Sequence, residues 1–532
     1  MSVLEAATPA AEPPASRRTS HLGWASTVAG SSGLAAAAGV GVGLAFPPYD
    51  IWWLAPVAIG ALLLLLHACR TPVIKRTVGM GALIGAAFGL TFFGLLTPWL
   101  RVIGWDAYGL VVAMSVAFMA VFGTGAVLIV RIPGWPVWVA CWWVAVEDLR
   151  GRIPFGGFPW GRIGQSQVDA PYVAWVAIGG VPMLTFMVVL SSAFGAWAVV
   201  ALVDRRRVPA ALGLGLASLT ILSGLAIATP ISGEQVNVAV VQGNVSDTGM
   251  DAFGRREAVL DAHLAATHEL AAEVRSGSVD APDAVIWPEN ASDIDPSLNQ
   301  DAFDKISAAV ADIGVPVLVG LVVDVDGGEH VANEGTVWEP TSGPGETYVK
   351  QNLVPFGEYV PLRGLLENFI SRLDRIPRDF VAGDVPGDLK LGPVTVADVI
   401  CFDVAYDDAV RGAVADGGEL ITVQTNNATY GHTGQAEQQW AISRLRAIEH
   451  ARSVVVASTS GISGVIAPDG TVQARAPEFE RATIVAPVAT RTSETLATRL
   501  GAWPGWVMSF IGFGALGVSI VVEVRRRGRV AA

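Results

Sequence analysis

Long apolar segments fill the chain up to about residue 230, and one more lies near residue 510. A helix needs about 20 predominantly apolar residues to cross a membrane. The pattern predicts eight spans, although the first is mostly Ala and Gly, and the fifth is short and ends in Glu147 and Asp148. The expected spans are 24–46, 51–68, 78–100, 108–130, 132–146, 181–203, 209–228 and 503–522.

Between the seventh and eighth spans, over residues 232–498, the pattern changes to short apolar runs separated by polar stretches. Short alternating runs are typical of strands, and apolar positions three or four apart are typical of helices. The alternation of the two predicts an α/β fold with helices covering both sheet faces. Strands are expected at 235–245, 284–290, 315–323, 395–403, 420–427 and 453–459, with a helix near 255–275.

A further helix is predicted over residues 435–452, QAEQQWAISRLRAIEHAR. Ala441, Leu445 and Ile448 recur there at helical spacing, so they form a stripe that is expected to face the core. The charged residues of this helix are expected to be solvated, as on most amphipathic helices.

The composition supports a membrane protein with one soluble domain. Hydrophobic residues make up 52% of the 532 residues, and the mean hydropathy is +0.48. The excess lies in the predicted spans, while residues 232–498 have the composition of an ordinary globular domain. The net charge is -13, and basic residues cluster at the membrane edges, which argues against a nucleic-acid partner.

Arginine and lysine are unevenly distributed among the short loops, and cytoplasmic loops carry an excess of them. With the N-terminus inside, the inner loops and tails hold Arg17, Arg18, Arg70, Lys75, Arg76, Arg131, Arg205, Arg206, Arg207, Arg525, Arg526, Arg527 and Arg529. The outer short loops hold only Arg101, Arg150, Arg152 and Arg162. Both termini are therefore expected in the cytoplasm. The predicted parts are a disordered cytoplasmic tail (1–22), a membrane domain of seven spans (23–231), an extracytoplasmic domain (232–498), a last span (499–524) and a cytoplasmic tail (525–532).

The loop over residues 150–171 is polar but rich in aromatic residues. Phe155, Phe158 and Trp160 suit either an ordinary aromatic belt at the membrane surface or a contact with lipid. Arg152 and Arg162 suit either a lipid phosphate or the usual position of a long basic side chain at a membrane edge.

Three ionisable residues stand at the ends of predicted strands: Glu289 in WPEN, Lys350 in KQNLVPFGEYVP and Cys401 in TVADVICFD. Together they suit acyl chemistry, because a carboxylate can take the thiol proton, the thiolate can attack a carbonyl, and an ammonium can stabilise the oxyanion. Singly they have simpler interpretations: a helix-cap acid, a surface lysine and a small buried hydrophobe. Cys401 is the only cysteine in 232–498, so this domain holds no internal disulfide.

These motifs resemble the Glu-Lys-Cys set of the nitrilase superfamily. LAFPPYDIWWLAPVA, GGFPWGRIGQSQ, VAVVQGN, TNNATYG, RLRAIEHAR and AWPGWV extend the likeness to the apolipoprotein N-acyltransferase family of bacterial lipoprotein maturation, from about residue 40 over nearly the whole chain. The resemblance implies a polytopic α-helical membrane domain joined to a nitrilase-like α/β domain, a four-layer αββα sandwich. It also implies a position in the bacterial cytoplasmic membrane.

The resemblance further implies that Glu289 is the general base, Lys350 the oxyanion stabiliser and Cys401 the nucleophile, with Glu358 supporting the lysine and the N–H of Phe402 completing an oxyanion hole. Phe158, Trp160 and Arg162 are then candidate lipid contacts. The implied reaction moves an acyl chain from a phospholipid to Cys401 as a thioester, and then to the amine of a diacylated apolipoprotein. No metal or cofactor is implied.

The chain departs from the family pattern at Phe402 and Asp403, where Tyr and Glu are common, and at Asn427 to Tyr430, where Asp-Ala-Trp-Phe is common. These departures touch the lining of the substrate pocket rather than the nucleophile. Two other functions stay open at this stage: a membrane-tethered amidase of the nitrilase type, and a non-catalytic scaffold for an envelope enzyme such as a polyprenol-phosphate sugar transferase.

Overall fold

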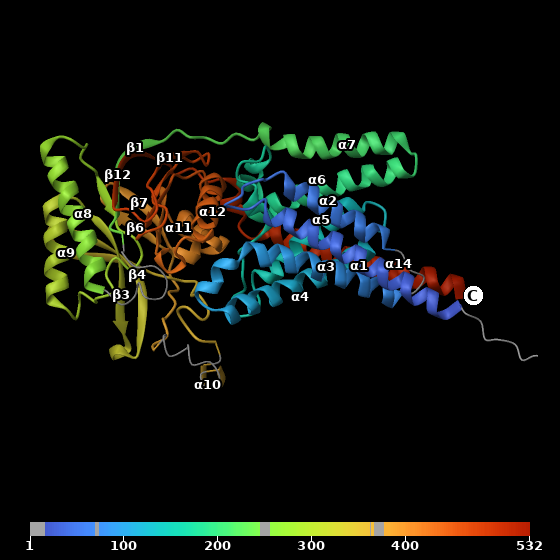
Figure 1. Ribbon diagram of the computed structural model, residues 1–532. Coiled ribbons are helices and arrows are strands. Elements are labelled where there is room, and N and C mark those ends of the chain that lie inside the picture. The colour runs from blue at the N-terminus through green and yellow to red at the C-terminus, as the bar shows by residue number, and fades with distance from the viewer. Residues whose placement is uncertain (1–15, 70–73, 245–255, 362, 367–376, 532) are drawn as a thin grey trace, which may run out of the picture.

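The computed structural model describes residues 16–69, 74–244, 256–361, 363–366 and 377–531. Apolar helices form one part of the molecule, and a sandwich of two sheets forms the other (Figure 1). The helices come from both ends of the chain, and the sandwich comes from the segment between them. The predicted division into a helical domain and an α/β domain is confirmed.

A helix forms at each of the predicted spans. The helical domain consists of α1 (Ser16–Gly43), α2 (Leu54–Ala68), α3 (Ile74–Leu96), α4 (Trp105–Ile129), α5 (Trp135–Arg150), α6 (Val176–Val203), α7 (Arg207–Leu222) and α14 (Trp503–Ala531). Within the described part of the chain, five helical segments are long and apolar enough to cross a membrane: Lys75–Leu96, Trp105–Ile129, Val173–Val203, Arg207–Ala226 and Trp503–Arg527. The shorter α2 and α5 have 15 and 16 residues.

The ends of the chain are more helical than the apolar pattern indicates. The helix α1 begins at Ser16, inside the segment 1–22 that was expected to be a disordered tail, and residues 1–15 of that segment lie outside the described residues. The helix α14 continues to Ala531, through the basic segment expected to be a tail. Helical hydrogen bonds continue past the last apolar turn because Arg is itself a good helix former.

Glycines bring α3 and α4 into close contact. A Cβ atom on Gly85 would lie 2.0 Å from the carbonyl oxygen of Met119, and one on Gly123 would lie 2.1 Å from that of Gly81. Small residues let two membrane helices approach until their backbones touch, which maximises van der Waals contact where no hydrophobic driving force is available.

The sandwich contains two sheets of six strands each. The first has the order β12-β1-β2-β3-β4-β5, with β1 (Glu234–Gln242), β2 (Ala284–Ile286), β3 (Val317–Val325), β4 (His330–Glu339), β5 (Gly343–Val349) and β12 (Ala482–Thr490). The second has the order β11-β10-β9-β8-β7-β6, with β6 (Asp388–Leu391), β7 (Val394–Ile400), β8 (Leu420–Thr425), β9 (Val454–Ser458), β10 (Gly464–Ile466) and β11 (Val472–Arg475). In each sheet the central three strands, β1-β2-β3 and β7-β8-β9, are parallel.

The two sheets pack face to face, and helices cover both outer faces. Val238 and Leu318 of the first sheet share an inner core with Val396 and Leu420 of the second. The outer face of the first sheet packs against α8 (Arg256–Ser276) and α9 (Gln300–Ile313), at the far end of Figure 1 from the membrane helices. The outer face of the second packs against α11 (Asp407–Ala415) and α12 (Gln435–His450). The predicted four-layer αββα order is confirmed.

The helix α12 lies between the second sheet and the membrane helices, so it has no solvated face. Leu445 and Ile448 are buried as predicted, but the expectation that its charges are solvated is wrong. Arg446, Glu449 and His450 are all less than 5% exposed. The second side of this helix is covered by α6 and by the loop that follows α5 rather than by water.

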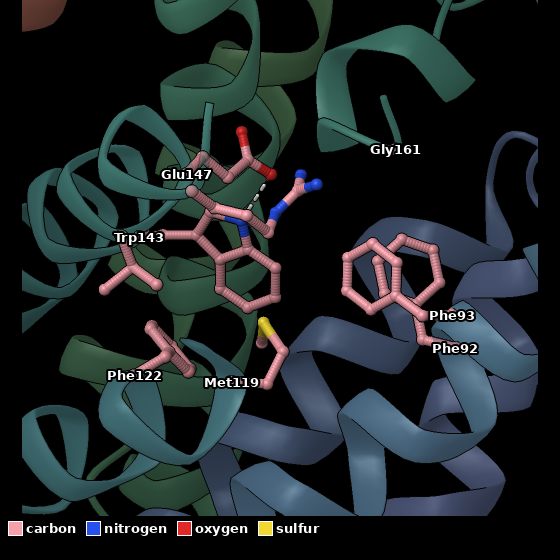
Figure 2. A pocket seen from close by; sticks show the side chains of 9 residues that line it. Phe92, Phe93, Met119, Phe122, Trp143, Glu147 and Gly161 are labelled. Atoms are coloured by element: carbon pink, nitrogen blue, oxygen red, sulfur yellow. Dashed lines mark hydrogen bonds between the residues drawn. The ribbon is translucent and has the colours of Figure 1, made fainter. Parts of the chain in front are cut away.

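The loop that follows α5 is tied to the helix bundle by a buried carboxylate. Glu147 accepts hydrogen bonds from the indole of Trp143 (2.8 Å), the backbone N–H of Ile163 (2.9 Å) and the hydroxyl of Thr185 (3.0 Å). Figure 2 shows the Trp143 indole pointing toward Glu147 among aromatic side chains of α3 and α4. The loop is therefore anchored by the bundle on one side.

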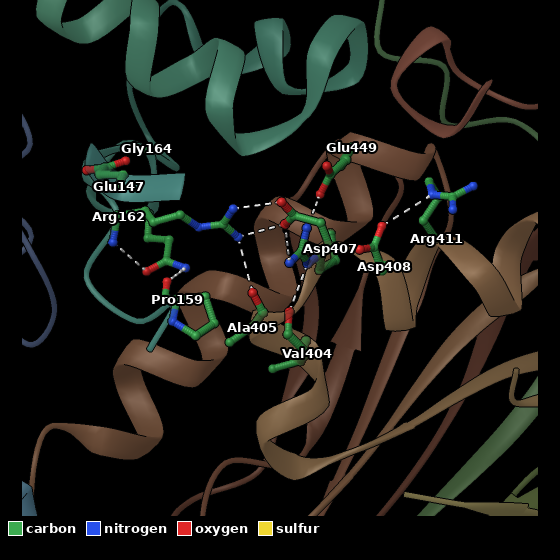
Figure 3. A network of polar contacts seen from close by, with 12 residues as sticks. Glu147, Pro159, Arg162, Gly164, Val404, Ala405, Asp407, Asp408, Arg411 and Glu449 are labelled. Atoms are coloured by element: carbon green, nitrogen blue, oxygen red, sulfur yellow. Dashed lines mark hydrogen bonds and ion pairs between the residues drawn. The ribbon is translucent and has the colours of Figure 1, made fainter. Parts of the chain in front are cut away.

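On its other side the same loop is joined to the sandwich by buried ion pairs (Figure 3). Arg162 binds both carboxylate oxygens of Asp407, at 2.7 and 2.6 Å, and donates to the carbonyl of Ala405 at 3.1 Å. Arg446 pairs with the same Asp407 at 2.8 Å and with Glu449. Burial disfavours the Asp407 carboxylate, yet the two arginines outweigh burial and lower its pKa.

We predict that Arg162→Met destabilises the protein more than loss of an exposed pair would, because it removes the bidentate partner of Asp407 and leaves that carboxylate with Arg446 alone. The Arg162 side chain is 8% exposed and that of Asp407 is 34% exposed, so the expected cost lies between about 1 kcal/mol, for an exposed pair, and about 3 kcal/mol, for a fully buried one. The matched control is Arg152→Met in the same loop, whose side chain is 45% exposed and pairs with Asp148. Thermal unfolding in detergent measures both, and an equal loss of apparent Tm in the two variants would contradict the prediction.

Candidate active site

Cys401 stands at the elbow where β7 ends and a short 3-10 helix, η8 (Cys401–Ala405), begins. Its φ is +51°, in the left-handed region, which costs a residue with a Cβ atom about 1 kcal/mol or more. Asp403 holds the elbow, because its carboxylate accepts from the N–H of Asn352 and the hydroxyl of Tyr348, each at 2.8 Å. The strand expected over 395–403 therefore ends at Ile400, and Cys401 stands at its end as predicted.

Glu289 follows β2 and points into the same region from the other sheet. Its carboxylate accepts from the side-chain amide of Asn333 and from the backbone N–H of Asn426, each at 2.7 Å, and the residue is 4% exposed. The turn that carries it lies directly on β3, since a Cβ atom on Gly320 would be 2.1 Å from the carbonyl oxygen of Pro288. Backbone contact therefore fixes the position of the acid.

Lys350 follows β5 and lies between two carboxylates. Its Nζ atom is 3.2 Å from Oε1 of Glu289 and 2.7 Å from Oε1 of Glu358, and its side chain is 1% exposed. The other oxygen of Glu358 accepts from the N–H of Val354 at 2.8 Å. Glu358 thus orients the ammonium while its own position is fixed by the loop.

The charges of this cluster act directly on Cys401. Burial works against the Lys350 ammonium, but Glu289 and Glu358 outweigh it and raise the pKa of Lys350 well above its usual value. Burial, followed by the Glu289 carboxylate, raises the pKa of Cys401 to about 12, against the opposing effects of Lys350 and a hydrogen bond from Thr425. The resting cysteine is therefore a thiol at neutral pH, and it needs a base in order to react.

The residue after the nucleophile rests on the membrane domain. Phe402 stacks on Trp160 with ring centroids 5.8 Å apart and on Phe158 at 6.3 Å. Trp160 also donates its indole N–H to Gln438 of α12 at 2.7 Å. Phe158, Trp160 and Arg162, named above as candidate lipid contacts, lie at the interface between the two domains, and the Arg162 guanidinium is occupied by Asp407 rather than free for a phosphate.

Three further residues belong to the site, and of these only Asn333 lies in no motif of the sequence, since Thr425 and Tyr430 are part of TNNATYG. Asn333, which bonds Glu289, lies inside β4, and Thr425, which bonds Gln439, is the last residue of β8. Tyr430 lies within electrostatic reach of Cys401, Glu289 and Lys350, and its ring meets Trp99 of the membrane domain edge-on at 5.3 Å. Only the pairing of distant strands and helices brings these residues to the nucleophile.

We predict that Lys350→Met lowers the reactivity of Cys401 toward iodoacetamide at pH 8 by at least about tenfold. Lys350 is the charge that lowers the thiol pKa, and each unit of further rise reduces the thiolate fraction about tenfold. Alkylation is measured in a chain in which Cys69 and Cys141 are replaced by Ala. Lys390→Met removes an exposed lysine and should leave the rate unchanged. Equal rates in the two variants would show that Lys350 does not act on the thiol.

Comparisons with known proteins identify the family of both parts of the chain. The family model described as the apolipoprotein N-acyltransferase N-terminal domain matches residues 38–194, and the carbon-nitrogen hydrolase model matches residues 237–497. Among solved structures, an amidase from Nesterenkonia sp. is 17% identical and aligns with 51% of this chain and 95% of its own, with a TM-score of 0.35, too low to support an argument.

Two curated relatives span nearly the whole chain. The apolipoprotein N-acyltransferase of Mycolicibacterium smegmatis is 38% identical over 91% of this chain and 84% of its own length. That of Pseudomonas paraeruginosa is 30% identical over 88% of this chain and 92% of its own. With both parts matched in order, this chain belongs to the apolipoprotein N-acyltransferase family.

Proposed function

We propose that Cys401 carries the acyl chain in the reaction of this enzyme, accepting it from a phospholipid and passing it to the amino group of a diacylated apolipoprotein. Family membership makes the chain a membrane-embedded acyltransferase that N-acylates lipoproteins. The observation that supports Cys401 as the carrier is its position beside the buried Glu289 and Lys350, at an elbow that rests on the membrane domain.

In the first step Glu289 takes the proton of the Cys401 thiol while the sulfur attacks the ester carbonyl of the phospholipid. The carbon–oxygen ester bond then breaks, the departing glycerol oxygen takes the proton from Glu289, and lysophospholipid leaves. The product is a thioester on Cys401. A base is needed because the thiol pKa is raised to about 12, so little thiolate is present at rest.

The tetrahedral intermediate of this step carries a negative oxygen that needs fixed hydrogen-bond donors. The Lys350 ammonium and the backbone N–H of Phe402 are suited to stabilise it. Lys350 keeps its charge because two carboxylates bond it, and the Phe402 N–H is in the first turn of η8, where N–H groups lack intrahelical acceptors. Donors of this kind each contribute about 10²- to 10³-fold in rate.

In the second step the amine of the apolipoprotein attacks the thioester carbonyl and gives a proton to Glu289. The carbon–sulfur bond breaks, an amide forms, and the proton on Glu289 returns to the Cys401 sulfur. Water must be excluded between the two steps, or the thioester is hydrolysed. The burial of Glu289, Lys350 and Cys401, each less than 10% exposed, favours transfer over hydrolysis.

We also propose that the enzyme lies in the bacterial cytoplasmic membrane with its sandwich on the extracytoplasmic side and both termini in the cytoplasm. The distribution of arginine and lysine in the short loops supports this orientation. A polyprenol-phosphate sugar transferase or another envelope enzyme as partner stays a prediction without structural support.

We predict that Cys401→Ala abolishes N-acylation of a diacylated lipopeptide, and that Glu289→Gln lowers it by about 10²-fold or more because the general base is lost. The purified full chain is incubated with a phospholipid labelled in its acyl chain, first without and then with the lipopeptide. The wild type should retain label as a hydroxylamine-sensitive thioester and release it to the peptide amine. Lys390→Met serves as the control for protein quality.

Acylation by the Cys401→Ala variant at the wild-type rate would exclude this mechanism. Label that reaches only free fatty acid, in the wild type and with the lipopeptide present, would instead identify a hydrolase.

A further inference from the structure

The helix α12 presents three buried glutamines, Gln435, Gln438 and Gln439, between the second sheet and the membrane domain. A buried amide is costly unless all of its hydrogen bonds are made. Two of these glutamines face in different directions, because neighbouring residues on a helix lie about 100° apart around its axis. Gln438 binds the membrane domain, and Gln439 binds the nucleophile elbow.

Gln439 holds the backbone of the elbow. Its Nε2 atom donates to the carbonyl oxygen of Cys401 at 3.1 Å. The carbonyl of Cys401 and the N–H of Phe402 belong to the same planar trans peptide, so they point in opposite directions. Fixing the carbonyl on the α12 side therefore also fixes the direction of the Phe402 N–H, which points away from α12. The left-handed φ of Cys401 makes such a restraint necessary.

The same amide also bonds the hydroxyl of Thr425. Its Nε2 atom donates to Oγ1 of Thr425 at 3.0 Å, and the same hydroxyl lies 3.2 Å from the Gln439 oxygen. That oxygen also accepts from Asn427 at 2.8 Å and from Gln435 at 3.2 Å. The Gln439 amide is therefore bonded at both its nitrogen and its oxygen, which fixes the direction of its bond to the Cys401 carbonyl.

The neighbouring Gln438 fixes the helix that carries this amide. Its oxygen accepts from the indoles of Trp99 (3.2 Å) and Trp160 (2.7 Å), and its nitrogen donates to the carbonyls of Leu96 (2.9 Å) and Pro47 (3.3 Å). All four of its partners belong to the membrane domain. The register of α12, and with it the position of Gln439, is therefore set by the loops of the membrane domain.

We propose that Gln439 is a positioning residue for acyl transfer, which holds the Cys401 carbonyl and thereby aims the Phe402 N–H at the oxyanion. This inference rests on the proposed function of Cys401 as the acyl carrier. Gln439 is bonded to the backbone of the elbow, so its removal affects the chemical step rather than substrate binding.

The test compares Gln439→Met, Thr425→Val and the control Ser443→Ala in the full chain with Cys69 and Cys141 replaced by Ala. Ser443 is buried on the same helix, and its hydroxyl donates to the backbone carbonyl of Gln439, so its replacement removes a buried hydrogen bond without touching the elbow. Two experiments are made: alkylation of Cys401 by iodoacetamide, and single-turnover formation of the thioester at a series of labelled-phospholipid concentrations, which gives both the maximal rate and the half-saturating concentration.

Gln439→Met should slow thioester formation by about 10²-fold with little change in the half-saturating phospholipid concentration, because the Phe402 N–H loses its direction. Alkylation of Cys401 should stay close to the wild-type rate, since the oxyanion donor does not act on the free thiol. Thr425→Val should slow thioester formation much less, since Gln439 keeps its bond to the Cys401 carbonyl. Ser443→Ala should match the wild type in both measurements.

The inference is overturned if Gln439→Met forms the thioester at the rate of Ser443→Ala, if only its half-saturating phospholipid concentration changes, or if alkylation falls as far as thioester formation does. If Gln439→Met does not accumulate as a folded protein, Gln439→Asn, which keeps an amide but is one methylene shorter, takes its place, and thioester formation at the wild-type rate in that variant overturns the inference. Failure of the underlying function looks different, because the wild type itself would then form no thioester on Cys401.

Discussion

A buried ammonium held between two carboxylates sets the conditions under which this site works. Lys350 is bonded by Glu289 and Glu358, so the site carries more negative than positive charge before any substrate arrives. Burial first, and the Glu289 carboxylate after it, raise the pKa of Cys401, so the sulfur keeps its proton. Burying such charges is tolerated only where further hydrogen bonds complete them, and Asn333 and the N–H groups of the adjoining turns supply these bonds. The result is a cysteine that is inert at rest and is activated when an ester carbonyl and the general base act together.

The same constraint explains why the membrane domain is more than an anchor, for which a single helix would be enough. The elbow that carries Cys401 is strained, and its next residue, Phe402, packs on Trp160 of the loop that follows α5. That loop is fixed by Glu147 within the bundle and by the pair of Arg162 with Asp407. A movement of the helix bundle relative to the sandwich would therefore displace the nucleophile. The two are joined by packed side chains and ion pairs, and such contacts act only over short distances. The fold makes the geometry of the site depend on its membrane-embedded part.

The sequence predicts those features that depend on local patterns. Apolar length locates the helices, and period-two alternation locates strands such as β7 and β8, because each needs only neighbours in the chain to be recognised. The motifs around Glu289, Lys350 and Cys401 resemble those of a known family, which supplies their roles, and the structure brings the three residues together. Asn333 and Gln439 could not be identified in this way. Each is an ordinary polar residue whose importance comes from a partner in another sheet or helix. The spacing of residues along the chain does not show which distant residue such a side chain contacts.

The wrong expectation for α12 shows where amphipathic reasoning fails. That reasoning assumes that a helix has water on one side, so polar residues mark the solvated face. The helix α12 has a sheet on one side and another domain on the other, and its polar residues are paired rather than hydrated. In such a helix a glutamine or arginine specifies position more sharply than a leucine does, because a hydrogen bond has direction and van der Waals contact has almost none. Buried polar residues are therefore expected wherever a fold must fix one helix or strand against two others. The helix α12 is such an element, because it contacts the membrane helices on one side and the nucleophile elbow on the other.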